Sequence, residues 1–271
     1  MKRIGIMTSG GDSSGMNAAI RAVVRSAMDR GCEVYGFLRG YSGVIGNNYR
    51  VMDSRAVSGI IQRGGTILQS ARCEEFKTED GQDAALKNLK GLRIEGVVVI
   101  GGDGSLRGAN ALSKKGMPAI GIPASIDNDI FGTDISIGAD TALNVIVSAV
   151  DMLKDTASSH DRAFIIEVMG RNCGYLAAMS AIACGAEVVI IPEIKYDLEK
   201  IVERLYARFN EGRTNSIVLV AEGAASAYKV DEQLKGRIGY ETRITVLGHL
   251  QRGGSPTVFD RILASRLGRN A

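Results

Sequence analysis

The sequence lacks the features that mark several classes of protein. No apolar run is long enough to span a bilayer, and the first residues pass from a short strand to a glycine loop without a secretory signal. A formal net charge of +3 is too small to indicate nucleic acid or a membrane as the main partner. The four cysteines show no CxxC spacing, and neither histidine has a cysteine spaced as a zinc partner. We therefore expect a cytoplasmic protein with reduced thiols that binds neither nucleic acid nor membrane.

Strand-like and helix-like segments alternate along almost the whole chain. Apolar residues recur at three- and four-residue steps over 16–29, which predicts a helix, with Gly31 as a stop after its end. Wholly apolar runs at 97–100 and 119–122 predict strands buried on both faces of a parallel sheet. Further strands are expected at 3–8, 33–38, 163–168, 188–191, 216–221 and 245–247, and further helices at 105–115, 140–154, 175–184 and 198–210. This alternation predicts an α/β fold of two stacked three-layer lobes with mainly parallel sheets, divided near Gly138.

Polar clusters follow the predicted strands, where α/β folds bind their ligands. The first cluster is Ser9-Gly10-Gly11-Asp12, followed by Gly15 at a helix start. Glycines there let backbone N–H groups approach an anion, and the helix N-terminus favours negative charge. A tight turn without a ligand explains this segment equally well.

The second cluster is Gly101-Gly102-Asp103-Gly104-Ser105. A carboxylate among phosphate-binding glycines requires a cation between them, which indicates Mg²⁺. Gly102, Gly104 and Gly108 also resemble a dinucleotide fingerprint, but Asp103 would repel a pyrophosphate that lacks a metal. No Walker A loop is present, because the dipeptide Gly-Lys never occurs.

A third cluster contains Asp127 and Asp129 in the string IDND after another strand. One carboxylate could accept a proton from a hydroxyl while the other helps to hold the metal. An isolated string of this kind would more simply be a solvated acidic loop or a helix cap. Its occurrence after the glycine loop that carries Asp103 favours the catalytic interpretation.

Arginines complete the candidate site. Arg171 in MGRNCG and Arg72 in SAR could each neutralise a transferring group, or form a structural salt bridge. Arg243, His249 and Arg252 near the end of the chain suit a phosphate monoester, although a lone histidine is more often structural.

Together these strings resemble the bacterial 6-phosphofructokinases, in the order and spacing of that family: TSGGDSSGMNAAIR, IQRGGTILQSAR, GGDGS, IDNDI, SSHDR, EVMGRNCG, TVLGHLQRGGSP and DRILASR. The resemblance implies a glycolytic kinase that transfers the γ-phosphoryl group of ATP to the 1-hydroxyl of fructose 6-phosphate with Mg²⁺. It also implies an allosteric homotetramer with shared active sites. The implied parts are a nucleotide lobe at 1–137, a lobe for sugar phosphate and effector at 138–255, and the start of a return to the nucleotide lobe at 256–271.

The resemblance assigns roles residue by residue. Asp127 matches the catalytic base, Ser125 its neighbouring hydroxyl, and Asp103 and Asp129 the carboxylates near Mg²⁺. Arg72 and Arg171 match the pair that stabilises the transferring phosphoryl group. The ATP site corresponds to Gly11, Tyr41, Arg72, Cys73, Phe76, Gly102, Asp103, Gly104 and Ser105. The sugar-phosphate site corresponds to Ser125, Asp127, Arg162, Met169, Gly170, Arg171, Glu222, Arg243, His249 and Arg252. In the family, the arginines that match Arg162 and Arg243 reach the 6-phosphate from a neighbouring subunit.

Two positions bear on the phosphoryl donor. Relatives that use pyrophosphate carry an aspartate at the position of Gly104 and a lysine at that of Ala124. A carboxylate at 104 would crowd and repel an α-phosphate, so ATP is the expected donor. Two departures are Ser125, where the family has threonine, and Cys73, where a phenylalanine often packs against adenine.

An effector site is a further expectation. The matching positions are Arg21, Arg25, Lys154, Gly185, Glu187 and Arg213. Arg21 and Arg25 are equally explained as an exposed helix face, because they are four residues apart. The family also continues several tens of residues beyond DRILASRLG, and a lobe without those residues is expected to expose apolar surface and a sheet edge.

Rival interpretations are a pyrophosphate-dependent phosphofructokinase, a subunit that binds nucleotide or effector without catalysis, and a dehydrogenase that binds NAD. An assay with both phosphoryl donors separates the first from the expected kinase. Retention of Asp127, Asp103 and Arg171 disfavours a purely binding role, which needs no general base.

Overall fold

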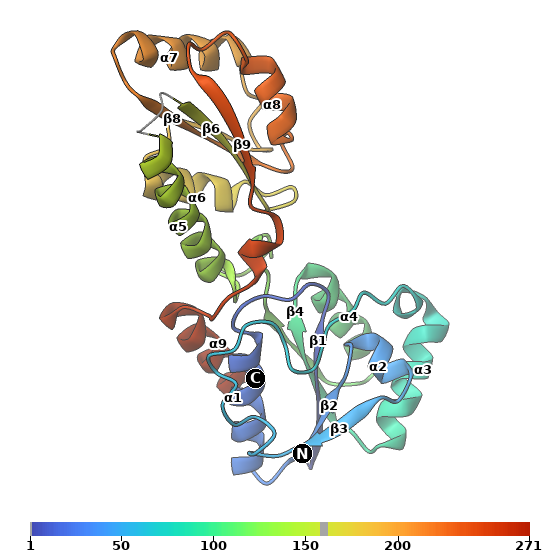
Figure 1. Ribbon diagram of the computed structural model, residues 1–271. Coiled ribbons are helices and arrows are strands. Elements are labelled where there is room, and N and C mark those ends of the chain that lie inside the picture. The colour runs from blue at the N-terminus through green and yellow to red at the C-terminus, as the bar shows by residue number, and fades with distance from the viewer. Residues whose placement is uncertain (1, 158–161) are drawn as a thin grey trace. The chain divides into compact units, whose positions relative to one another are not determined.

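The computed structural model describes residues 2–157 and 162–271. The first four residues of the string SSHDR, among them His160, lie outside the described residues. The described chain divides into two compact units (Figure 1). Unit 1 comprises residues 1–126, 130–141 and 252–271, and unit 2 comprises 127–129 and 142–251. The transitions at 141 and 252 lie within a few residues of the expected boundaries at 137 and 256.

Unit 1 contains a sheet in the order β3-β2-β1-β4-β5. Its strands are β1 (Arg3–Ser9), β2 (Glu33–Phe37), β3 (Tyr49–Met52), β4 (Gly96–Gly101) and β5 (Ala119–Pro123). All neighbours pair in parallel except β2 with β3. In the parallel pair of β1 and β4, Ser9 lies opposite Gly101, so the loops that follow these two strands start side by side.

Helices cover both faces of this sheet (Figure 1). Side chains alternate along a strand, and Ile6, Val98 and Ile100 pack on α1 (Met16–Asp29) and α9 (Val258–Asn270). Met7 and Val99 face the opposite core. That core is formed with α2 (Tyr41–Ile45), the short 3₁₀ helix η1 (Glu75–Lys77), α3 (Glu79–Gly91) and α4 (Asp103–Lys114).

Unit 2 contains a fully parallel sheet in the order β7-β8-β6-β9. Its strands are β6 (Arg162–Val168), β7 (Val188–Ile190), β8 (Asn215–Ala221) and β9 (Glu241–Val246). In Figure 1, α5 (Ala139–Ala157) and α6 (Tyr175–Cys184) lie on one face, and α7 (Leu198–Asn210) and α8 (Ala227–Leu234) on the other. A second 3₁₀ helix, η2 (Gly248–Arg252), follows β9. The expected α/β class with mainly parallel sheets is thus confirmed.

Most predicted elements occur within a few residues of their expected ends. The predicted helix 16–29 is α1, and Gly31 follows its C-cap with φ 73°, as expected of a helix stop. The expectation that 119–122 is buried on both faces is wrong. β5 is an edge strand, α4 covers one of its faces through Leu106, and Ile120 is 46% exposed.

Some elements were not predicted, among them α3, α8 and α9. The buried face of α9 consists of Asp260, Ala264 and Gly268, which is a stripe of small and polar residues. A Cβ at Gly268 would lie 2.7 Å from the carbonyl oxygen of Ala19, so α9 packs closely on α1. β9 extends further towards its start than expected, because its edge position tolerates charged residues such as Glu241 and Arg243.

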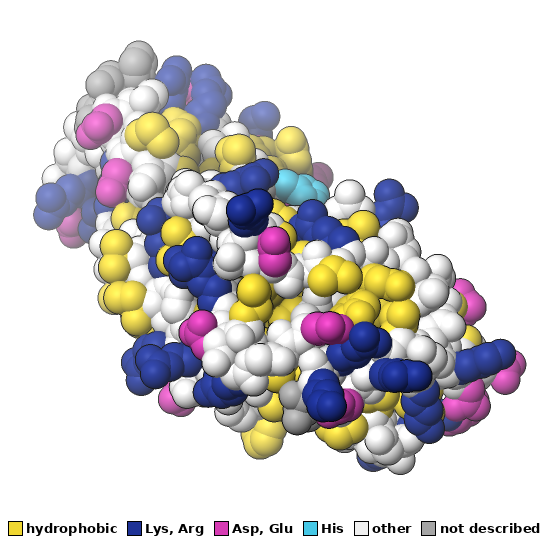
Figure 2. Space-filling view, turned by 90° about the horizontal axis from the view of Figure 1, so that it is seen from below, with side chains coloured by type: hydrophobic (Ala, Val, Ile, Leu, Met, Phe, Trp, Pro, Cys, Tyr) yellow, Lys and Arg dark blue, Asp and Glu magenta, His cyan; other side chains and the backbone are white. Residues whose placement is uncertain are grey.

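The distribution of charged side chains on the surface is consistent with the small net charge of the chain. On the face shown in Figure 2, Lys and Arg side chains lie among Asp and Glu side chains and apolar atoms, so no field of one sign covers it. Among the helices of the described residues, none combines the length and the apolar character that a bilayer crossing requires.

A buried carboxylate joins α9 to the start of α5 within unit 1. Asp260 is fully buried and accepts hydrogen bonds from the backbone N–H of Gly138 at 2.9 Å and from both the N–H and the hydroxyl of Thr141 at 2.8 and 2.5 Å. Burial raises the pKa of Asp260, and these hydrogen bonds oppose that rise. The side chain therefore satisfies three buried donors at the point where the chain leaves unit 1.

We predict that Asp260→Ala lowers the free energy of unfolding by about 3 kcal/mol, because three buried donors lose their acceptor. Asp53 is exposed and accepts one N–H, from Ala56, so Asp53→Ala is a matched control with an expected loss below about 1 kcal/mol. Urea titration measures both. Equal losses in the two variants would contradict a special role of Asp260.

Candidate functional site

The first glycine loop of unit 1 lines a pocket. Gly10 has φ 84°, donates its N–H to the carbonyl of Ala71 at 3.4 Å, and accepts from the hydroxyl of Ser70 at 2.6 Å. These bonds hold the segment 70–72 against the loop. The pocket has a volume of about 360 Å³ and is lined by Gly10, Gly11, Asp12, Thr66, Ser70, Arg72 and Arg252.

Arg252 reaches this pocket from the last segment of unit 1. A Cβ at Gly11 would lie 2.8 Å from Nη1 of Arg252, so the glycine leaves room for the guanidinium group. Nη1 also lies 3.8 Å from Oδ1 of Asp12. Arg72 and Arg252 thus give the pocket two guanidinium groups, which suits an anion. Asp12 was named in the first polar cluster, but Asp12, Thr66 and Ser70 were not predicted as site residues, although all three lie in strings that carry the family resemblance.

The second glycine loop starts α4 next to the first. The N–H of Ser105 bonds the carbonyl of Gly102 at 2.9 Å, and its hydroxyl oxygen would lie 3.2 Å from a Cβ at Gly10. Asp103 is exposed at the first helical position, and its carboxylate pairs with Arg107 at 2.7 Å. Gly104 is exposed, and a Cβ there would meet no protein atom within 4 Å. The N-terminus of α4 at Gly104 therefore faces open space next to the first glycine loop.

The aromatic residues expected at the nucleotide are buried beneath this loop. Tyr41 and Phe76 are 4% and 5% exposed, and their rings stack at 3.9 Å between centroids. The hydroxyl of Tyr41 donates to the carbonyl of Ser105 at 2.7 Å, and burial raises the pKa of Tyr41 well above its ordinary value. Cys73 is half-buried against the same core. Through these contacts the two rings support the loop at the start of α4. Their burial leaves little ring surface that could contact a nucleotide base.

Ser125 follows β5 near the same loop in unit 1. Its carbonyl accepts from the hydroxyl of Ser136 at 2.5 Å, and a Cβ at Gly102 would lie 3.9 Å from Cβ of Ser125. The N–H of Ala124 donates to the carbonyl of Gly101 at 3.0 Å. The strand end that carries Ser125 is therefore held next to the α4 loop.

In unit 2, Asp127 and Arg171 form an ion pair. The side chain of Asp127 is 5% exposed, and its Oδ2 lies 3.3 Å from Nε of Arg171. Arg171 has φ 51°, and its N–H donates to Oε1 of Glu222 at 3.0 Å. Three segments that are distant in sequence thus meet beyond the carboxyl ends of β6 and β8.

The loop that carries Arg171 is held tightly. A Cβ at Gly223 would lie 1.7 Å from the carbonyl oxygen of Arg171, so the loops after β6 and β8 fit together only with glycine there. The N–H of Met169 donates to Oε1 of Gln251 at 3.1 Å, and Nε2 of Gln251 donates to the carbonyl of Gly248 at 3.0 Å. Gln251, which was not predicted as a site residue, therefore joins the loop after β6 to the segment that carries His249.

Exposed groups surround this pair of loops. Asp129 and His249 are exposed, and Gly170 has φ 140°. Burial raises the pKa of the Cys173 thiol, and the nearby carboxylates of Glu193, Asp129 and Asp127 raise it further. Cys173 is therefore disfavoured as a thiolate nucleophile.

Arg162 and Arg243 lie at the opposite end of the unit 2 sheet. Both pair with Glu241, at 3.1 Å and 2.5 Å, and hydrogen bonding to Arg162 is the main cause that lowers the pKa of Glu241. Arg162 begins β6, whereas Met169 follows its end, so the two are separated by about 20 Å. Within one copy of unit 2, these arginines are therefore far from Arg171.

The expected effector positions are used in different ways. Lys154 donates to the carbonyl of Cys184, and Gly185 takes the left-handed conformation that ends α6. Glu187 is bound by Arg208 at 2.8 Å and by the N–H of Ile217 at 2.6 Å, so its carboxylate has a structural task. Arg213 is exposed in unit 2, and Arg21 and Arg25 lie on α1 in unit 1.

Comparisons with known proteins give the family. The sequence model described as "Phosphofructokinase" matches residues 3–271. An ATP-dependent 6-phosphofructokinase of Halalkalibacterium halodurans is 57% identical over 271 residues, which are 100% of this chain and 85% of that protein. Another, of Thermotoga neapolitana, is 57% identical over 272 residues with the same coverage.

A solved structure supports the same assignment. Pichia pastoris phosphofructokinase in the T-state is 41% identical with a TM-score of 0.95, and the match covers 100% of this chain but 32% of the yeast chain, about a third of its length. Sequence and fold agree over the whole chain, which therefore belongs to the phosphofructokinase family.

Proposed function

We propose that this chain transfers the γ-phosphoryl group of ATP to the 1-hydroxyl of fructose 6-phosphate, giving fructose 1,6-bisphosphate and ADP. The observation that carries the proposal is the buried carboxylate of Asp127, which Arg171 contacts at 3.3 Å in a chain with these relatives. Asp127 accepts the proton from the attacking hydroxyl. Arg171 and Arg72 neutralise charge on the transferring group, so the reaction proceeds by positioning and charge stabilisation without a covalent enzyme intermediate.

We propose that Asp103 and Asp129 contribute to a Mg²⁺ site. No group of three His, Cys, Asp or Glu side chains that could hold a metal ion occurs in the part of the chain that the structure describes. Oxygens of ATP must therefore supply further ligands, which agrees with the preference of Mg²⁺ for one or two carboxylates plus substrate phosphates. When bound, Mg²⁺ would neutralise charge on the β- and γ-phosphate oxygens.

The space at Gly104 supports ATP as the donor. No protein atom would contact a Cβ at this position, so the packing of the chain itself does not require glycine. A ligand group that approaches the backbone closely provides the reason for its presence. An α-phosphate, which ATP has and pyrophosphate lacks, fits this requirement.

The opposite placement of Arg162 and Arg243 supports shared active sites. Because Arg162 lies about 20 Å and Arg243, which is opposite Phe164, about 16 Å from the loop of Arg171, they can serve the same sugar phosphate only if another copy of the chain presents them. We therefore propose a homo-oligomer, with a tetramer as the expected form.

We predict that Asp127→Ser lowers kcat by about 10²–10⁴, the usual contribution of a general base, with little change in the KM for fructose 6-phosphate. A coupled assay of ADP formation measures both quantities. Asp197, the N-cap of α7 in the same unit, gives the control Asp197→Ser, which retains a capping oxygen and should retain wild-type turnover. Near-normal turnover of Asp127→Ser would refute the assignment of the base.

We predict that Gly104→Asp leaves the melting temperature unchanged and lowers ATP-dependent turnover by at least about tenfold, because the new carboxylate would repel an α-phosphate. ATP and pyrophosphate should be assayed side by side. The control is Gly91→Asp at another glycine whose Cβ would meet no protein atom within 4 Å. Undiminished use of ATP by Gly104→Asp would contradict this account of donor choice.

We predict that Asp127→Ser and Arg243→Ala, each nearly inactive alone, recover activity when they are unfolded together and refolded as a mixture. Mixed oligomers would contain some sites in which both residues are intact. Each variant refolded alone is the control. If mixed oligomers form, as native mass spectrometry can establish, and no activity returns, the active sites are not shared in this way.

A further inference from the structure

We propose that Thr8 is a positioning residue whose buried hydroxyl holds Gln69 in a left-handed conformation and thereby directs Arg72 into the pocket beside the first glycine loop. The proposal rests on the proposed function, in which Arg72 neutralises charge on the group that is transferred. Thr8 lies near the end of β1 and is fully buried, so it acts on the reaction through the segment that carries Arg72.

The hydroxyl of Thr8 belongs to a short directed chain of hydrogen bonds. Its oxygen lies 2.7 Å from the carbonyl oxygen of Gln69 and 2.8 Å from the hydroxyl oxygen of Thr66. A threonine hydroxyl has one hydrogen and a carbonyl oxygen can only accept, so the hydroxyl of Thr8 donates to Gln69. The hydrogen between the two threonines must then come from Thr66. Loss of the Thr8 hydroxyl therefore removes a partner from both the carbonyl of Gln69 and the hydroxyl of Thr66.

This direction decides which side chains of the pocket can bind an anion. Thr66 lines the pocket, but its hydrogen is turned towards Thr8. The hydroxyl of Ser70 also lines the pocket, and it donates to a backbone carbonyl of the first glycine loop at 2.6 Å. Among the side chains that line the pocket, the guanidinium groups of Arg72 and Arg252 are therefore the donors left for an anion. An anion is thus bound well only if Arg72 is correctly directed.

Gln69 has a backbone conformation that residues other than glycine rarely adopt. Its φ is 59°, in the left-handed region. Such a conformation persists only where the surrounding structure determines it. Nε of Arg39 donates to Oε1 of Gln69 at 3.0 Å, and the N–H of Arg39 donates to the carbonyl of Leu68 at 2.9 Å. Because Arg39 and Gln69 are exposed, water weakens the contact between their side chains, whereas Thr8 is 0% exposed.

The residues after Gln69 transmit this orientation to Arg72. The hydroxyl of Ser70 donates to the carbonyl of Gly10, and the carbonyl of Ala71 accepts from the N–H of Gly10 at 3.4 Å. Arg72 is the next residue and is exposed at the pocket. The direction of its side chain therefore depends on a backbone that is fixed at three successive residues, beginning with Gln69.

The earlier part of the same segment has a separate anchor. Nδ2 of Asn17 on α1 donates to the carbonyls of Arg63 and Gly64 at 3.0 and 3.1 Å, and Oδ1 accepts from the N–H of Ile67 at 2.8 Å. This anchor remains when the hydroxyl of Thr8 is lost. We therefore expect a local change, confined to the residues that lead to the pocket.

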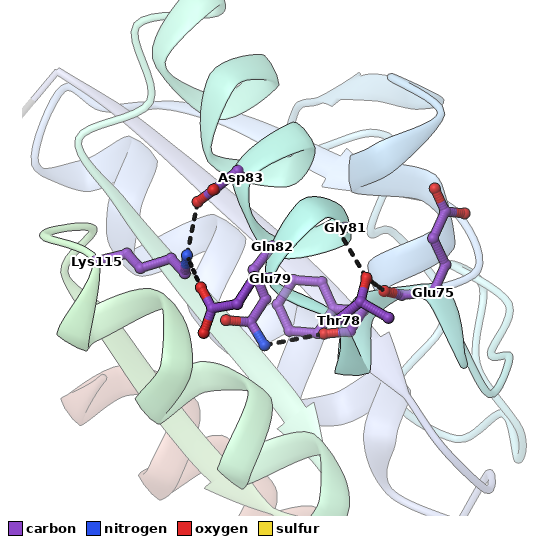
Figure 3. A network of polar contacts seen from close by, with 8 residues as sticks. Glu75, Thr78, Glu79, Gly81, Gln82, Asp83 and Lys115 are labelled. Atoms are coloured by element: carbon purple, nitrogen blue, oxygen red, sulfur yellow. Dashed lines mark hydrogen bonds and ion pairs between the residues drawn. The ribbon is translucent and has the colours of Figure 1, made fainter.

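The hydroxyl is removed by Thr8→Val, which keeps the shape of the side chain, and is retained by Thr8→Ser. The matched control is Thr78→Val at the start of α3 (Figure 3). The hydroxyl of Thr78 also donates to a backbone carbonyl, that of Glu75, at 2.7 Å, and it accepts from the N–H of Gly81 at 3.1 Å. Both valine variants thus lose one donated and one accepted hydrogen bond in the same unit.

Other contacts hold the start of α3 when the hydroxyl of Thr78 is removed. The side-chain amide of Gln82 donates to a backbone carbonyl of η1 at 3.2 Å. Nζ of Lys115 lies between the carboxylates of Glu79 at 2.5 Å and Asp83 at 2.6 Å, as Figure 3 shows. Thr78→Val should therefore lower the melting temperature without moving the residues at the pocket.

We expect calorimetric titration to show a rise of about three- to tenfold in the dissociation constant of ATP for Thr8→Val, and values within about twofold of wild type for Thr8→Ser and Thr78→Val. The value of kcat should fall by about tenfold or more for Thr8→Val, because a displaced arginine stabilises the transferring group poorly. The KM for fructose 6-phosphate should stay within about twofold of wild type. Similar losses of melting temperature in the two valine variants, with unchanged ATP affinity and turnover in both, would overturn the proposal.

A substitution at Gln69 tests the link between Thr8 and the pocket. Glycine adopts the left-handed conformation readily, so it needs no hydroxyl to hold it there. Thr8→Val should therefore change the dissociation constant of ATP less in a Gln69→Gly background than in the wild type. An equal change in both backgrounds would contradict the proposal.

Direct measurement of binding separates a failure of this proposal from a failure of the proposed function. A wild-type chain that binds ATP without phosphorylating fructose 6-phosphate contradicts the proposed activity alone, and the ATP affinities of the variants then still test the role of Thr8. A wild-type chain that binds no nucleotide contradicts both.

Discussion

The parallel pairing of β1 with β4 is the constraint on which the nucleotide side of unit 1 depends. Parallel strands end at the same edge of a sheet, and the register that sets Ser9 opposite Gly101 brings two glycine loops together although about ninety residues separate them. The hydroxyl of Ser105 then packs at Gly10, and the pocket forms where the loops leave the sheet. Unit 2 repeats this arrangement, with Arg171 and Glu222 beyond the ends of β6 and β8.

Much of this could be predicted from the sequence, because the relevant signals are local. The apolar period of α1 and the continuous apolar run of β4 follow directly from burial, and each glycine cluster lies after a strand. The exposure of β5 could not be predicted in this way. An edge strand and a central strand have similar compositions when one face of the edge strand is covered, so Ile120 carries no mark of its position.

The functional residues show the same limit. Asp127 and Arg171 were predicted from short strings of the sequence, whereas Gln251 was not, because it acts through a contact with the backbone N–H of Met169, which is far from it in the sequence. Glycines show it most clearly. Gly11 makes room for Arg252, Gly108 makes room for Tyr41, and Gly104 leaves space that no protein atom fills. Glycine thus occurs at these three positions for three different physical reasons, and only the folded structure distinguishes them.

The return of α9 to unit 1 has a consequence for the order in which the protein is made. Unit 2 is almost continuous, from 142 to 251, but unit 1 needs residues 252–271 to complete the core around α1. Since domains generally fold as units while the ribosome supplies the chain, unit 2 has all its main segments before unit 1 does. The face of α1 that receives Ala264 and Gly268 must then remain uncovered while more than a hundred residues are synthesised.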